Sequence, residues 1–171
     1  MEKEKLRSLQ APLKEQYREK PESAMVTLKA QGRIGEGVSC KIETGRALAE
    51  AGLHPATGGN GLTVCSGDML LEALAACAGV TLNAVATAKG IKIDEGIVET
   101  EGDLDFRGTL GVSKEVPVGF QNIRLKFVLK TNASEDELST LIRLTERYCV
   151  VFQTLNSPPR ISILQQVTKA S

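Results

Sequence analysis

The residues of this chain best suited to chemistry are its four cysteines and its single histidine, His54. The cysteines are Cys40, Cys65, Cys77 and Cys149. Neither the CxxC nor the HxxxH spacing of a zinc site can be built from these positions, so we expect no metal centre. A thiolate is a nucleophile, and two thiols that meet in a fold can form and break a disulfide. We therefore expect any chemistry of this protein to be carried out by its thiols.

Cys77 lies within "LLEALAACAGVTL", residues 70–82, which has the composition of a helix. One helical stripe contains Leu70, Leu74, Cys77, Thr81 and Ala84. This spacing turns Cys77 toward the interior, and the surrounding alanines and glycine allow another element to approach closely. Cysteine is also among the most buried residue types, so Cys77 alone is compatible with plain core packing.

Cys149 has a similar position on a second predicted helix. "SEDEL" is a capping box formed by Ser134 and Glu137, and it predicts a helix through about residue 154, ended by "NSPPR". One stripe of this helix contains Leu138, Ile142, Thr145, Cys149 and Phe152. The two stripes can face each other. A disulfide would need a Cα separation of about 4.4–6.8 Å, which sequence alone does not determine.

The elements that must position these thiols follow from hydrophobic periodicity and turn residues. We expect a hairpin from residues 24–42, a glycine-rich loop over 45–63, and a central helix from Ser66 or Asp68, either of which could be the N-cap, to Gly90. Strands are predicted at 93–106, 122–131 and 160–167. The order β-β-α-β-β-α-β predicts an α+β fold. We divide the chain into an N-terminal helical arm, residues 1–22, and one domain, residues 23–171.

The composition argues against several partners. The chain has 21 basic and 21 acidic side chains, so it has no single-sign field to attract nucleic acid or an anionic membrane. The most apolar run, residues 69–82, is short and is interrupted by Glu72, and the charged N-terminus does not resemble a signal peptide. We therefore expect a cytoplasmic protein with reduced cysteines.

Two motifs carry a resemblance to a known family. "SGDMLLEALAACAGVTL" is similar to the central-helix motif of the OsmC/Ohr superfamily, and "RYCVVFQTL" resembles its second-cysteine motif. The resemblance implies an intertwined homodimer in which an antiparallel sheet wraps around central helices. It also implies a hydroperoxide reductase in oxidative stress defence, in which Cys77 attacks the peroxide and Cys149 resolves the sulfenic acid. Such an enzyme needs no metal or organic cofactor, only an external thiol reductant of dithiol or lipoyl type.

The chain departs from the family's peroxidases at the residues that would activate the thiol. Those members resemble one another in having an upstream arginine and a glutamate ten residues before the cysteine, a position that is Gly67 here. Asp68 and Arg46 are our candidates for these two roles, although Asp68 could equally be only an N-cap and His54 is a second choice of cation.

Two further departures keep a second function open. Val150 replaces the proline that usually follows the second cysteine, which could lengthen that helix. Cys65 could be an alternative resolving thiol or an incidental loop residue, and Cys40 fits strand packing. The alternative function is a non-catalytic protein that binds a small hydrophobic or electrophilic ligand in the dimer pocket.

Overall fold

The structure is a computed structural model that describes most of the chain from residue 48 onward. The described residues are 2–5, 7–8, 10–11, 19, 31–34, 39–43, 48–111 and 113–168. The predicted helical arm lies largely outside these residues, and residues 24–30 of the predicted hairpin lie wholly outside them.

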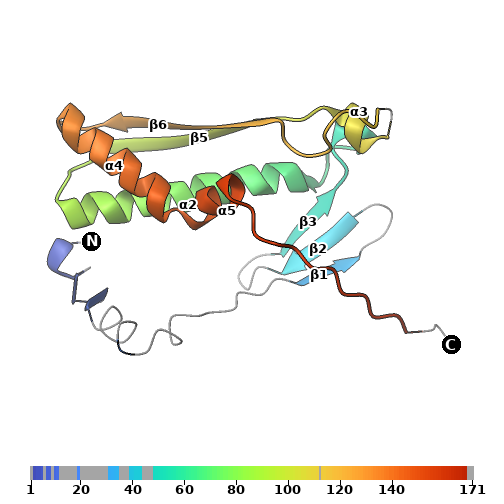
Figure 1. Ribbon diagram of the computed structural model, residues 1–171, viewed down its shortest axis with the longest axis horizontal. Helices are drawn as coiled ribbons and strands as arrows, with labels where there is room; N and C mark the ends of the chain where they lie inside the picture. The colour runs from blue at the N-terminus through green and yellow to red at the C-terminus, as the bar shows by residue number, and fades with distance from the viewer. Residues whose placement is uncertain are drawn as a thin grey trace.

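Strands and helices are segregated along the chain, which confirms the α+β prediction (Figure 1). The strands are β1 (Gln31–Ile34), β2 (Ser39–Glu43), β3 (Leu48–Gly52), β4 (Val64–Cys65), β5 (Glu95–Asp103) and β6 (Asn122–Lys130). The helices are η2 (Pro55–Thr57), α2 (Ser66–Lys89), α3 (Phe106–Thr109), α4 (Glu135–Tyr148) and α5 (Val150–Asn156).

The first sheet has the order β1-β2-β3-β4. β1 and β2 form an antiparallel hairpin, as predicted. β3 pairs antiparallel with β2, so the prediction of a loop over 45–63 was wrong for this segment. "LAEAG" has little intrinsic preference for a strand, and its pairing with β2 and β4 overrides that preference.

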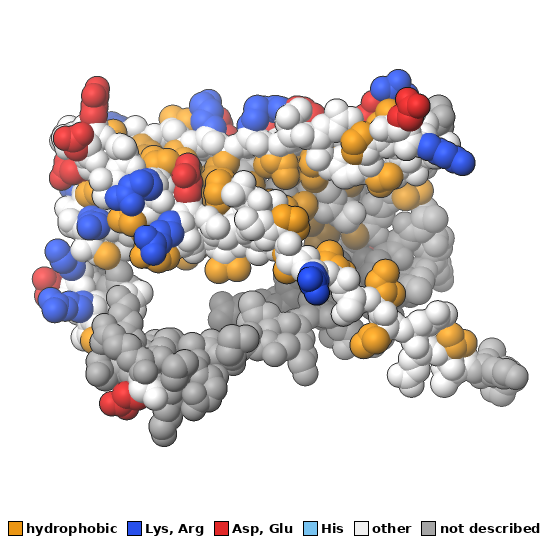
Figure 2. Space-filling view, viewed as in Figure 1, with side chains coloured by type: hydrophobic (Ala, Val, Ile, Leu, Met, Phe, Trp, Pro, Cys, Tyr) orange, Lys and Arg blue, Asp and Glu red, His pale blue; other side chains and the backbone are white. Residues whose placement is uncertain are grey.

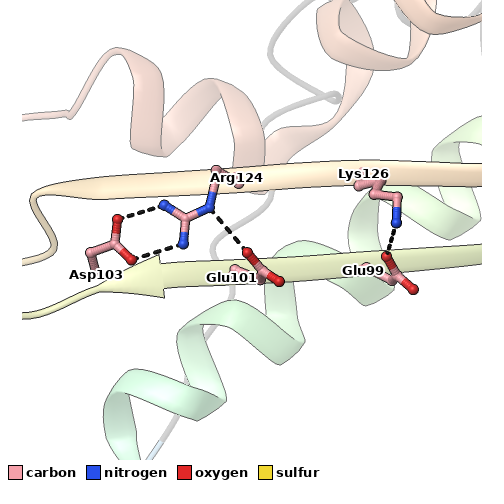
Figure 3. Close-up of polar contacts among 5 residues, drawn as sticks. All are labelled: Glu99, Glu101, Asp103, Arg124 and Lys126. Carbon is pink, nitrogen blue, oxygen red and sulfur yellow. Dashed lines mark hydrogen bonds and ion pairs between the residues drawn. The ribbon is translucent and has the colours of Figure 1, made fainter.

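The second sheet consists of the antiparallel strands β5 and β6, in the predicted places. The face toward the helices is apolar, whereas the other face has cross-strand ion pairs (Figure 3). Lys126 Nζ lies 2.8 Å from Glu99 Oε2, and Arg124 pairs with both Asp103 and Glu101. Opposite charges on directly opposed residues favour this register, in which a slip of one residue would turn the charged face inward.

α2 is the central helix of the fold and packs against β5, α4 and α5. Its N-cap is Cys65, so the predicted caps Ser66 and Asp68 fall inside the first turn instead. Its C-terminal end is as predicted: Gly90 has φ 76°, and its N–H donates to the carbonyl groups of Ala86 and Thr87. A glycine suits this left-handed conformation because it has no Cβ.

α4 begins with the predicted capping box, in which Ser134 and Glu137 satisfy each other's backbone N–H groups. The helix does not continue to residue 154 as predicted, because it ends at Tyr148 and α5 begins at Val150. The predicted last strand is not formed within the single chain. Residues 158–168 are extended, exposed and unpaired, and they lead away from the helices (Figure 1). A strand needs a neighbouring backbone to pair with, and this segment meets none among the described residues of its own chain.

The core consists of two clusters between α2, α4 and the inner face of β5–β6. Leu141 of α4 is fully buried against Leu82 and Ala86 of α2. We expect Leu141→Ala to lower the free energy of unfolding by about 2–5 kcal/mol, because it removes buried contacts and leaves a cavity. Leu110→Ala, at an exposed position, should change it by less than about 0.5 kcal/mol. Urea denaturation at one fixed protein concentration would measure both, and equal effects would contradict this description of the core.

Candidate active site

Cys77 lies near the middle of α2, at the edge of its buried face. The buried positions of this helix are Leu74, Ala78, Leu82 and Ala86. Of the stripe that we predicted, only Leu74 is among them. Cys77 is half-buried and packs against the cluster that contains Cys149. A reactant can therefore reach its sulfur, while one side of the thiol is held against protein.

Cys149 is the single residue that separates α4 from α5. Its ψ angle of 107° is extended rather than helical, so the chain turns at this residue although no proline follows it. The backbone remains connected on both sides, because the Cys149 N–H donates to the Thr145 carbonyl and the Cys149 carbonyl accepts from the Gln153 N–H. The Cys149 side chain is only 1% exposed.

This break brings the second thiol to the first. Cys77 packs against the buried cluster that contains Cys149, each thiol shifts the pKa of the other, and both are free rather than joined in a disulfide. The expectation that the two helical stripes face each other is therefore confirmed for their cysteines. The backbone N–H groups of Val150 and Val151, which begin α5, also lie against the Cys77 sulfur.

The surroundings of Cys77 favour its thiolate. Burial raises the pKa of the Cys77 thiol, but the Val151 N–H, the Cys149 thiol and the Val150 N–H outweigh that effect. The Thr81 hydroxyl, one turn along α2, adds a further hydrogen bond. Together these donors hold the pKa of Cys77 below its ordinary value, because they stabilise the charged form.

The surroundings of Cys149 have the opposite effect. Burial is the main cause that raises the pKa of the Cys149 thiol. The Phe152 N–H opposes it, the neighbouring Cys77 sulfur raises the pKa further, and the Val151 N–H lowers it least. Two adjacent thiols cannot both ionise without repulsion. The pair is thus asymmetric, because the pKa of Cys77 is lowered and that of Cys149 is raised, so Cys77 is the more readily ionised of the two thiols.

A groove of about 430 Å³ with both apolar and polar lining residues lies between β6 and the helices α4 and α5, and neither cysteine of the pair lines it. Leu74 and Phe152 pack on the cysteine cluster and also line this groove. Glu146 and Asn156 are among the polar residues that line it as well. Such a groove suits a small, mainly apolar ligand.

Asp68 is not near the thiols within the chain. It is exposed and lines a separate cavity of about 350 Å³ at the N-terminal end of α2, together with His54 and Cys65. Nine residues of helix separate it from Cys77, which corresponds to about 13 Å along the axis. The His54 ring stacks on Phe106, and its Nδ1 accepts from the Ala56 N–H, so this side chain is also held away from Cys77.

Arg46 lies outside the described residues, as does the side chain of Cys40. Among the described residues, no group of three or more His, Cys, Asp or Glu side chains could hold a metal ion. In the part of the chain that the structure describes, the groups that lower the pKa of Cys77 are hydrogen-bond donors, and the role expected of Arg46 stays a prediction. Sequence reasoning missed the Val150 and Val151 N–H groups, because a backbone donor has no residue type to identify it.

The family follows from a comparison with known sequences. The model of the OsmC-like protein family matches residues 58–164, which include the central helix and both cysteines of the pair. The chain belongs to this family. No curated protein sequence matches the chain.

Solved structures show the same OsmC-like fold at low sequence identity. An OsmC-like protein from Mycoplasma pneumoniae is 22% identical, with a TM-score of 0.65 over 78% of this chain and 89% of that one. An organic hydroperoxide resistance protein from Legionella pneumophila is 18% identical, with a TM-score of 0.61 over 78% and 92%. Another from Elizabethkingia anophelis is 18% identical, with a TM-score of 0.62 over 79% and 91%. At this identity the comparison supports the fold alone.

Proposed function

We propose that the protein is a thiol-dependent reductase of organic hydroperoxides, in which Cys77 attacks the peroxide and Cys149 resolves the product. The observation that carries this proposal is the contact between the two thiols, together with their opposite pKa shifts. The OsmC-like fold adds support, since two of the structural neighbours are organic hydroperoxide resistance proteins.

The reaction balances without a metal or an organic cofactor. The Cys77 thiolate attacks one oxygen of the O–O bond, which breaks, and the alcohol leaves after taking a proton. Cys77 is then a sulfenic acid, oxidised by two electrons. The Cys149 sulfur displaces its oxygen as water and forms the Cys77–Cys149 disulfide. A dithiol reductant, such as a lipoyl group, restores both thiols and is itself oxidised to a disulfide.

The groove argues for organic rather than inorganic hydroperoxides. Leu74 and Phe152 line this groove and also belong to the thiol cluster, so an alkyl or aryl group bound there would lie next to residues that pack around the thiols. Burial of that group would contribute about 25 cal/mol per Å² of apolar surface, which hydrogen peroxide cannot gain.

A homodimer would cover the apolar surface that the single chain leaves open. Four side chains of the extended C-terminal segment, Ile161, Ile163, Leu164 and Val167, are 72–95% exposed (Figure 2). α2 is long and apolar enough to cross a membrane by length and composition alone, and Val80 on it is largely exposed. Contiguous exposed apolar surface of this kind marks an interface. A second copy of the chain, in the cytoplasm, is the partner that we propose, rather than a membrane or nucleic acid.

The dimer predicts a definite effect at the C-terminal segment. Ile163→Asp combined with Leu164→Asp should shift the protein from twice the 18.3 kDa chain mass toward that of one chain, because two charges would be buried at the interface. Gln165→Asp combined with Gln166→Asp adds the same charge at neighbouring polar positions and should remain dimeric. Light scattering after size exclusion would measure both. A wild type with the mass of one chain would contradict the dimer.

The alternative is a non-catalytic protein that binds a small hydrophobic or electrophilic ligand. It is favoured by Gly67, which stands where the family's peroxidases have a glutamate, and by the open groove. One experiment separates the two functions: the reduced protein is mixed with one equivalent of cumene hydroperoxide, and its disulfides are mapped by mass spectrometry. The peroxidase forms the Cys77–Cys149 disulfide and releases the alcohol. A protein that keeps its thiols reduced is the binding protein.

A further inference from the structure

A hydrogen bond from the Gln153 side chain to the Glu146 backbone spans the break between α4 and α5, and we call this hydrogen bond the clamp. In an uninterrupted α-helix, the carbonyl group of Glu146 would accept from the N–H of Val150, four residues later. Here the Gln153 side-chain amide donates to the Glu146 carbonyl oxygen instead, at 2.8 Å. This hydrogen bond joins the last turn of α4 to the first turn of α5 and spans Cys149.

The clamp and the thiol contact depend on the same local geometry. Once the Glu146 carbonyl is occupied by Gln153, the Val150 N–H is free to face Cys77 rather than to continue α4. The extended ψ of 107° at Cys149 then places the buried Cys149 thiol on the Cys77 sulfur. A continuous helix would remove the Val150 N–H from Cys77, because that donor would return to Glu146.

We propose that Gln153 is a positioning residue, which holds the α4–α5 break through its hydrogen bond to the Glu146 carbonyl and so keeps Cys149 in reach of Cys77. The inference rests on the proposed function and gives a role to Gln153, a residue of the second-cysteine motif to which the resemblance assigned none. Gln153 touches no reacting atom; it acts through the backbone.

The position of Gln153 allows this role to be separated from general stability. Its side chain is exposed and is not part of the core cluster around the thiols, so replacing it creates no cavity. Its backbone is already fixed, because its N–H donates to Cys149 and its carbonyl accepts from Ser157. The side-chain amide is the group that a substitution changes.

The test uses two substitutions that differ in the donor. Gln153→Met keeps the length of the side chain and removes the N–H, whereas Gln153→Lys keeps a donor that can reach the same carbonyl. Thr154→Met, at the exposed neighbouring position, controls for the added apolar side chain. After one equivalent of cumene hydroperoxide, quenched-flow mass spectrometry would follow the Cys77 sulfenic acid, its sulfinic acid and the Cys77–Cys149 disulfide.

We expect Gln153→Met to form the disulfide about 2- to 10-fold more slowly than wild type, the factor that corresponds to one net hydrogen bond. More of its Cys77 should reach the sulfinic acid when peroxide is in excess, since resolution competes with further oxidation. Gln153→Lys and Thr154→Met should both resolve at close to the wild-type rate. If Gln153 acted through side-chain packing rather than through its N–H donor, Gln153→Lys would not restore the wild-type rate of disulfide formation.

The outcomes distinguish the clamp from the function on which it rests. If wild type and Gln153→Met form the disulfide at the same rate, the proposed role of the clamp is wrong, whereas the proposed peroxidase function is unaffected. Slow resolution in both Gln153→Met and Gln153→Lys, or in Thr154→Met, also overturns it, because the loss would not follow the donor. A wild type that forms no disulfide overturns the peroxidase, and the clamp with it.

Discussion

Cys77→Ser should abolish reduction of cumene hydroperoxide. A serine hydroxyl does not ionise near neutral pH, and its oxygen cannot take up the peroxide oxygen as sulfur does. Loss of a nucleophile that no neighbour replaces commonly lowers turnover by more than about 1000-fold. Turnover would be measured with a dithiol reductant, from the rate at which the hydroperoxide disappears.

Cys65→Ser is the matched control for this substitution. Cys65 is also a partly exposed free thiol, but it lies at the N-terminal end of α2, in a cavity separate from the thiol pair. We expect this variant to retain wild-type turnover. Equal losses in both variants would mean that a general thiol effect, rather than the arrangement around Cys77, explains the activity.

Cys149→Ser should separate the two halves of the reaction. Cys77 keeps its thiol and still reacts with peroxide, so about one equivalent is consumed per chain. Without the resolving thiol, the Cys77 sulfenic acid persists, and excess peroxide converts it to the sulfinic acid. Intact-mass spectrometry would show the addition of one and then two oxygen atoms to the variant.

Wild type under the same conditions should lose two hydrogens and gain no oxygen, which is the mass change of a disulfide. A Cys149→Ser variant that turns over at the wild-type rate would show that another thiol resolves the sulfenic acid. Cys65 would then be the first residue to test, although the structure places it away from Cys77.

The sequence predicted the elements whose signals are local. The capping box at Ser134 and the C-terminal Gly90 of α2 are in the predicted places. The alternation in β6 gave the correct inner face, because a period of two assigns every side chain to a side of the sheet. Helical spacing likewise predicted that Cys77 and Cys149 would face each other.

The remaining features depend on contacts that local sequence does not encode. The helix break at Cys149 occurs without a proline, and it is stabilised by a hydrogen bond between residues seven positions apart. β3 forms because β2 lies beside it, not because its residues favour strands. The predicted last strand has no partner among the described residues, and a second copy of the chain in the proposed dimer could supply one.

The pH dependence of the reaction follows from the asymmetry of the thiol pair. The thiolate fraction rises as pH rises through the pKa of Cys77, so a lowered pKa moves the onset of activity to lower pH. Peroxide consumption should therefore remain high at pH values where an ordinary thiol, with a pKa of about 8.5, is mostly protonated.

The most direct measurement is the pH dependence of iodoacetamide alkylation, resolved by mass spectrometry for Cys77 in Cys149→Ser and for both cysteines in wild type. The account predicts that Cys77 in wild type titrates below about 8.5 and Cys149 above it. It also predicts that the pKa of Cys77 stays lowered in Cys149→Ser, because the serine hydroxyl is a hydrogen-bond donor and the Val150 and Val151 N–H groups remain. A wild-type Cys77 that titrates at or above the pKa of Cys149 would contradict the account.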